Sequence, residues 1–143
     1  MGLSQYIFTA TCTDEMTSKM AHQVSCQSVT IFEQLCLTGR VFANNKQGLA
    51  VVEGPTGLVE QYFQALSSDV LLETILLHSS HSIKVREFSD FSIWINLRQE
   101  YYFTDKVRRL TKNSIKEALP KSPSARLKIM AEAYLQGDML AAA

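Results

Sequence analysis

Three histidines and three cysteines have the broadest chemistry in this chain, since imidazoles and thiolates bind metals, move protons and attack electrophiles. The six residues are Cys12, Cys26, Cys36, His22, His78 and His81. A structural zinc site needs about four ligands, usually with pairs spaced as in CxxC, and only His78 and His81 lie that close together. No general base with an orienting group can be assigned to any cysteine. We therefore expect exposed or capping histidines, reduced and partly buried thiols, no metal site and no enzyme.

Length and composition are those of a globular protein. The chain has 143 residues, of which 46% are hydrophobic and 20% charged, enough for one domain with a core. No apolar run approaches the ~20 residues of a membrane span, and no basic-then-apolar leader opens the chain. These features predict a soluble, cytoplasmic protein without a membrane partner.

Charge is unevenly distributed along the chain. Residues 1–96 carry a net charge of −4, whereas residues 97–128 carry +6. The basic side chains of the second part could contact nucleic acid or an acidic protein; they include Lys106, Arg108, Arg109, Lys112 and Lys116. A solvated helix face is the simpler interpretation, so we expect no nucleic-acid partner.

Hydrophobic periodicity predicts seven elements in the first two thirds of the chain, in the order strand, helix, strand, strand, helix, strand, strand. Their approximate positions are 6–11, 15–33, 37–43, 48–53, 59–66, 71–77 and 91–97. The run 71–77 is short and apolar, which is typical of a buried strand. Two helices on one face of such a sheet predict an α+β, ferredoxin-like β-α-β-β-α-β-β sandwich, and we place this domain at residues 5–97.

Residues 98–143 are predicted to form a helical extension. Phe103, Val107, Leu110 and Ser114 recur at helical spacing, and Leu119-Pro120 ends that helix. Ser122-Pro123 would start a second helix, whose apolar stripe is Leu127, Met130, Ala131 and Tyr134 and which Gly137 would end. The stripe could cover the open face of the sheet or join a partner; we favour a homo-oligomer contact through these C-terminal helices.

Several short motifs add a resemblance to this pattern. They are Leu37-Thr38-Gly39, Glu53-Gly54, Asp69 and Arg86-Glu87-Phe88. In order and spacing, over about residues 5–96, the chain resembles the BLUF family of flavin-binding blue-light sensors, in its short form with a C-terminal helix pair. The resemblance implies the same ferredoxin-like fold.

The resemblance also implies where a flavin would bind. The family's tyrosine on the first strand falls at Ala10 and its glutamine on the third strand at Ala50. Its asparagine late in the first helix falls at Phe32, and a basic residue on the second helix falls at Ala65; Phe91 and Ile93 occupy the last-strand positions. Of the polar positions that we can place, Asp69 alone is still polar. Each unpaired polar group of a buried flavin would cost about 1–3 kcal/mol, so we expect no cofactor.

These observations predict a BLUF-like regulatory protein that has lost flavin chemistry and acts through protein–protein contacts. Two alternatives stay open. The chain could be a genuine FAD-binding blue-light receptor with an atypical pocket, or the altered pocket could bind another apolar small molecule.

Overall fold

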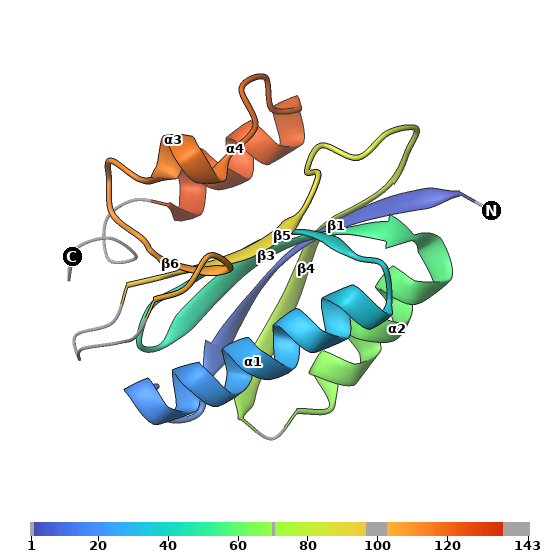
Figure 1. Ribbon diagram of the computed structural model, residues 1–143. Coiled ribbons are helices and arrows are strands. Elements are labelled where there is room, and N and C mark those ends of the chain that lie inside the picture. Colours follow the sequence, from blue (N-terminus) through green and yellow to red (C-terminus); the bar gives the residue numbers. More distant parts are fainter. Residues whose placement is uncertain (1, 70, 97–102, 136–143) are drawn as a thin grey trace.

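The computed structural model describes residues 2–69, 71–96 and 103–135 as six strands and four helices (Figure 1). The elements are β1 (Leu3–Cys12), α1 (Ser18–Gln34), β2 (Thr38–Ala43), β3 (Gln47–Pro55), α2 (Thr56–Ser67), β4 (Leu72–Ile83), β5 (Phe91–Ile95), β6 (Val107–Arg109), α3 (Ile115–Ala118) and α4 (Ala125–Tyr134). The predicted α+β, ferredoxin-like class is confirmed.

All six strands belong to one mixed sheet, in the order β4-β1-β3-β2-β5-β6. The strands β4, β1, β3 and β2 pair antiparallel with their neighbours, whereas β5 and β6 are added in parallel beyond β2. The central strand β3 is buried on both sides, and its residues from Leu49 to Gly54 are all buried. A strand covered on both faces reads as a continuous apolar run, as Leu49 to Val52 does.

Helices cover both faces of the sheet, α1 and α2 on one side and α3 and α4 on the other (Figure 1). Side chains alternate between the two faces along each strand, so β1 sends Tyr6 and Phe8 toward α1 and α2 and Ile7 toward α3 and α4. We call these sides the α1/α2 face and the α3/α4 face. Each has its own apolar core cluster.

Two glycines of the sequence motifs allow close approach of neighbouring strands. Gly39 has φ +140°, a conformation that L side chains rarely adopt, and a Cβ there would lie 1.8 Å from the carbonyl oxygen of Val51. A Cβ on Gly54 would lie 2.7 Å from the Leu37 side chain. The motifs at 37–39 and 53–54 therefore fix the packing of β2 on β3.

The first helix begins later than predicted. We expected a start near residue 15, at the acidic pair that follows Thr13. Instead Thr17 is the N-cap, and its hydroxyl accepts a hydrogen bond from the Met20 amide at 3.2 Å. A threonine side chain satisfies an amide that the helix itself cannot.

The prediction of a buried strand at 71–77 is wrong in its burial and its length. β4 runs from Leu72 to Ile83 and lies at the edge of the sheet, with Leu76 55% and Leu77 44% exposed. Leu97, the predicted end of β5, and the predicted domain boundary between residues 97 and 98 lie outside the described residues.

The predicted helix through Phe103 and Ser114 is also wrong. Val107–Arg109 forms β6, and residues 107 and 110 pack on opposite faces of the sheet, Val107 on the α1/α2 face and Leu110 on the α3/α4 face. Two residues three positions apart point to opposite faces in an extended strand, whereas in a helix they lie on the same face. The basic residues of this region therefore lie just before β6, on β6, on the following turn and on α3 instead of along one helix.

The second C-terminal helix is confirmed, with a shifted start. Its N-cap is Ser124, whose hydroxyl accepts a hydrogen bond from the Leu127 amide, and not the predicted pair Ser122-Pro123. Leu127 is buried, and the rest of the predicted stripe packs with it on the α3/α4 face of the sheet. The stripe thus covers its own sheet, which removes our reason for placing an oligomer contact there; Gly137 lies outside the described residues.

Within the described ranges, no helix is long and apolar enough to cross a membrane.

Candidate functional site

Three aromatic rings meet on the α1/α2 face, where the resemblance places a flavin. Phe32, near the end of α1, is 1% exposed. Its ring centroid lies 3.7 Å from that of Phe91 on β5, with the planes tilted by 32°. On its other side, Tyr62 of α2 meets the Phe32 ring edge-on at 4.9 Å. Side chains from both helices and the sheet therefore fill the gap between α1 and α2.

The Tyr62 hydroxyl is buried in this aromatic group. Burial raises the pKa of Tyr62 far above its ordinary value, and a hydrogen bond with Ser28 of α1 opposes this only in part. The phenol therefore stays protonated, and its hydrogen bond ties α2 to α1 across the gap. Any ring that enters between α1 and α2 must displace the Phe32 side chain or separate Tyr62 from Ser28.

Ala50 lies in the same core cluster as Phe32, as the resemblance implies. It is 7% exposed and pairs with Phe8 on β1 and with Val41 on β2. Ala10 pairs with Gly48 instead, two residues further along β1. The β1 side chain beside Ala50 is thus the phenylalanine at position 8, whose ring meets that of Phe63 at 5.1 Å.

The other two predicted positions are exposed. Ala65 lies on the solvent side of α2, and Asp69 follows its end. The Asp69 carboxylate accepts a hydrogen bond from the Leu71 amide at 2.9 Å, and its carbonyl accepts one from the Leu72 amide at 3.2 Å. Asp69 therefore stabilises the turn into β4, and the structure does not bring it together with Phe32 and Ala50 in the core.

Sequence reasoning missed a tyrosine–carboxylate contact at the side of this core. Tyr6 of β1 donates a hydrogen bond to Glu60 of α2, and Gln64 donates a second one to the same carboxylate at 2.8 Å. The hydrogen bond to Glu60, followed by burial, raises the pKa of Tyr6. The bonds from Gln64 and Tyr6 lower the pKa of Glu60. Nothing in the sequence pattern indicates that Tyr6 and Glu60 are partners.

A second group of polar residues lies on the α3/α4 side and begins with two buried side chains, Gln5 of β1 and Glu53 of β3. The Gln5 amide nitrogen donates to Glu53 at 2.8 Å. The two Glu53 oxygens also accept the backbone amides of Glu87 at 2.9 Å and Phe88 at 3.0 Å. A buried carboxylate that is fully hydrogen-bonded avoids the cost of an unpaired charge. Glu53 therefore fixes the segment between β4 and β5 against the sheet.

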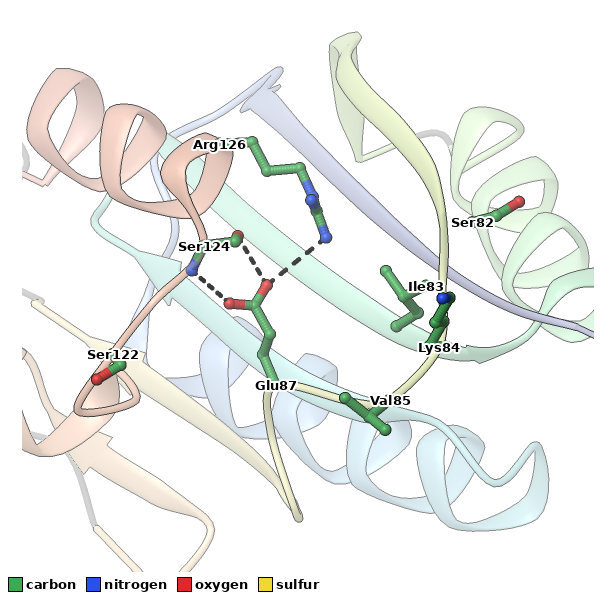
Figure 2. A pocket seen from close by; sticks show the side chains of 8 residues that line it. All are labelled: Ser82, Ile83, Lys84, Val85, Glu87, Ser122, Ser124 and Arg126. Carbon is green, nitrogen blue, oxygen red and sulfur yellow. Dashed lines mark hydrogen bonds and ion pairs between the residues drawn. The ribbon is translucent and has the colours of Figure 1, made fainter.

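Glu87 extends this group to the start of α4 (Figure 2). Its carboxylate accepts the backbone amide of Ser124 at 2.6 Å and the Ser124 hydroxyl at 2.9 Å, and lies 3.8 Å from the Arg126 guanidinium. Gln5 donates a further bond to Glu87 at 2.6 Å and accepts one from Arg126 at 2.7 Å. Carboxylates are favoured at helix N-termini. We call Gln5, Glu53, Glu87, Ser124 and Arg126 the α4 network.

Electrostatics in the α4 network favour an ionised Glu87. Burial opposes ionisation, but hydrogen bonds from Gln5 and Ser124 and the charge of Arg126 outweigh it and lower the pKa of Glu87. Glu53 and Glu87 both belong to motifs that carried the resemblance. Their structural role is to join β1, β3 and the segment before β5 to α4.

Two open clefts lie beside these groups. A cleft of about 390 Å³ adjoins the α4 network (Figure 2), and its lining residues include Lys84, Glu87, Ser122, Ser124 and Arg126. Another, of about 190 Å³, lies at the sheet side of α1, where Phe32 and Phe91 form part of its wall together with Thr38, Asp90 and Lys106. The second cleft reaches the rings that close the gap between α1 and α2.

The histidines and cysteines are scattered through the fold. Among the described residues, no group of three or more His, Cys, Asp or Glu side chains could hold a metal ion. His78 hydrogen-bonds Thr9 at 2.8 Å, and Cys12, Cys26 and Cys36 are free thiols. Cys26 and Cys36 are exposed, against the expectation of partial burial.

Side chains on the α1/α2 face do not match the polar contacts that the resemblance implies for a flavin. Phe32 and Ala50 offer no hydrogen bond, Ala65 is exposed, and the aromatic rings occupy the gap between the helices. In this conformation the residues present do not fit the ring.

Comparison with known proteins identifies the family. The model of the BLUF family, described as sensors of blue-light using FAD, matches residues 3–94. The dark-state structure of the BLUF protein BlrB is 22% identical to this chain with a TM-score of 0.57, and the match covers 68% of this chain and 74% of BlrB. No curated protein matches.

A second structural relative is much longer than this chain. BlrP1 from Klebsiella pneumoniae, solved with FMN and cyclic diGMP, is 16% identical with a TM-score of 0.73; the match covers 93% of this chain but 34% of BlrP1. A structure of the BlrP1 BLUF part is 13% identical with a TM-score of 0.67, and 94% of this chain and 90% of that one are covered. This chain thus spans about a third of BlrP1, and at these identities the structural matches establish the fold.

These findings correct one prediction. We expected no cofactor, but the family that matches is described by its use of FAD, and the BlrP1 structure was solved with FMN. Apolar side chains at positions 32 and 50 are therefore no evidence that flavin binding is lost. The chain belongs to the BLUF family, the sensors of blue-light using FAD.

Proposed function

We propose that this chain is a regulatory, flavin-binding sensor of blue light with an atypical, largely apolar pocket. The observation that carries the proposal is the family match over residues 3–94, which includes α1, α2, the strands β1 to β4 and all of β5 but its last residue. The family is one of sensors, and the chain spans only a third of BlrP1. We therefore assign sensing to this chain.

The closed gap between α1 and α2 weakens flavin binding without forbidding it. Separating one aromatic pair such as Phe32 and Phe91 costs about 0.5–1.5 kcal/mol beyond the area that it exposes. A micromolar ligand binds with about 8 kcal/mol. If only a fraction of the molecules is in the open form, the apparent affinity for the flavin is the affinity of the open form multiplied by that fraction. Rotation of Phe32 toward the 190 Å³ cleft beside it is the smallest change that would make room.

The α4 network supports a regulatory output on the opposite face of the sheet. Gln5 and Glu53 lie on β1 and β3, the strands whose other residues, Phe8 and Ala50, face the α1/α2 gap. Glu87 and Arg126 connect those strands to α4. A shift of β1 or β3 thus changes contacts at the start of α4, and we propose α4 as the element whose position reports the state of the pocket.

The test is to purify the chain after expression with added riboflavin and to record its absorption before and after blue illumination. We expect a bound flavin with a band near about 450 nm that light shifts reversibly. Titration of the flavin-free protein with FAD and with FMN, followed by quenching of flavin fluorescence, measures the affinity. A correctly folded protein that binds neither flavin at saturating concentration would contradict the proposal.

A further inference from the structure

The two edges of the sheet are protected to different degrees. β6 has three residues, and two of them are arginines; Arg108 lies over the Trp94 ring at 4.9 Å. A short, charged edge strand resists pairing with another chain. β4 has twelve residues, of which only Glu73 carries a formal charge, and it contains no proline. Its inner edge pairs with β1, and among the described residues no strand pairs with its outer edge.

β4 exposes large apolar side chains on both faces of the sheet. Leu77 pairs with Phe8 and so lies on the α1/α2 face, while Leu76 pairs with Thr9 and lies on the α3/α4 face. Their exposed fractions are 44% and 55%, and Leu71, just before the strand, is 39% exposed. An exposed, long and apolar edge strand is a template for strand addition. These properties make β4 suited to a partner strand that forms backbone hydrogen bonds with its outer edge.

The charges at the two ends of β4 are complementary to each other. Glu73 lies near its start, and Lys84 follows its end; both are exposed. In an antiparallel pair of two β4 strands, the start of one copy faces the end of the other. A register that sets Glu73 opposite Lys84 forms the same ion pair twice about a twofold axis.

β4 is irregular at two places against β1, and the central irregularity fits the same register. Near the start of the strand, Thr11 pairs with Thr74 and Cys12 with Leu72, so Glu73 is an extra residue there. Ile7 pairs with Ser79 and Phe8 with Leu77, so His78 is an extra residue, as in a β-bulge. With Glu73 opposite Lys84, the twofold axis passes between residues 78 and 79. Residues 74–77 of each copy, which lie between its two irregularities, then pair with residues 80–83 of the other.

We propose that β4 is a self-association edge, at which a second copy of this chain pairs antiparallel to make one sheet continuous across both copies. Backbone hydrogen bonds and the exposed leucines supply the affinity. Exposed ion pairs contribute little energy, so Glu73 and Lys84 act on the register and on the choice of partner. This surface is distinct from the C-terminal helices on which the sequence placed an oligomer contact, and it does not depend on a flavin.

The test is sedimentation velocity over a range of protein concentrations, with circular dichroism of each variant to confirm its fold. We expect the wild type to be a dimer at high-micromolar protein concentrations. Glu73→Lys and Lys84→Glu should each raise the dimer dissociation constant about tenfold or more, because each sets like charges opposite each other twice. The double variant Glu73→Lys/Lys84→Glu should restore the wild-type value.

A matched control separates this edge from the C-terminal helix. Leu76→Lys places a charge on β4, and Ile129→Lys makes a similar change on α4, where Ile129 is 63% exposed. We expect the first to give a monomer and the second to leave the dimer intact. A monomeric wild type, a dimer lost only in Ile129→Lys, or a double charge variant that fails to dimerise would each overturn the proposal.

Discussion

The two faces of the sheet are held by different kinds of contact. On the α1/α2 face, α1 meets α2 and β5 chiefly through the rings of Phe32, Tyr62 and Phe91. On the α3/α4 face, the start of α4 is held by the ionised, hydrogen-bonded side chains of Glu87 and Arg126. The van der Waals attraction between rings depends little on their relative direction, whereas a charged hydrogen bond requires a defined geometry of donor and acceptor. The first face can therefore open by side-chain rotation while the second keeps its geometry until a hydrogen bond breaks.

We expect the largest effect on this comparison from removal of Glu53, the fully buried carboxylate of the α4 network. Glu53→Ala leaves the backbone amides of Glu87 and Phe88 without their acceptor and removes one of the two acceptors of the Gln5 side chain. Unsatisfied buried donors cost about 1–3 kcal/mol each, so we expect the free energy of unfolding to fall by about 3–5 kcal/mol. Urea unfolding followed by tryptophan fluorescence measures it.

An exposed glutamate of α1 provides the control for that variant. Glu33→Ala removes the same side chain from the surface and should change stability by less than about 0.5 kcal/mol. Equal losses of unfolding free energy in the two variants would show that the hydrogen bonds of Glu53 do not stabilise the fold.

A smaller and more local effect is expected at the N-cap of α4. Ser124→Ala removes the cap of Leu127 and the hydroxyl bond to Glu87, but leaves the Ser124 backbone amide bound to that carboxylate. We expect a loss of about 1–2 kcal/mol, accompanied by faster amide hydrogen exchange in α4. Exchange in α1 should stay as in the wild type.

Its matched control is Ser122→Ala. Ser122 lines the same cleft as Ser124 (Figure 2) but does not cap the helix. This variant should keep the wild-type stability and the wild-type exchange in α4. If Ser122→Ala loosened α4 as much as Ser124→Ala did, the N-cap would not be what holds the helix.

Local pattern was enough to predict the sequence of elements from β1 to β5. The β-branched and aromatic residues of β1, the motifs at 37–39 and 53–54 and the apolar stripe of α2 each lie within a few neighbouring residues. The edge position of β4 was not predictable, because a run such as Leu71 to Leu77 has the same composition in a central and in an edge strand. β6 was missed because the spacing of Val107 and Leu110 suits a helix unless their two different burial faces are known.

The candidate site divides in the same way. Phe32 and Ala50, two of the positions that the resemblance assigns to the pocket, lie in one core cluster. The contacts of Glu53 and Glu87 could not be predicted, although both residues were singled out as motifs. Their partners Gln5 and Arg126 lie 48 and 39 residues away along the chain, respectively, and only the folded sheet brings them together.

Our central claim is that the α1/α2 face receives a flavin when the Phe32 ring moves aside. The direct measurement is the FAD dissociation constant of the wild type, of Phe32→Leu, and of Phe42→Leu. Phe42 is equally buried but lies on the α3/α4 face. We predict that the wild type binds FAD and that Phe32→Leu binds it about tenfold more tightly, since a smaller side chain removes part of the cost of opening. Phe42→Leu should bind as the wild type does. No binding by any of the three folded proteins, or tighter binding in Phe42→Leu alone, would contradict the claim.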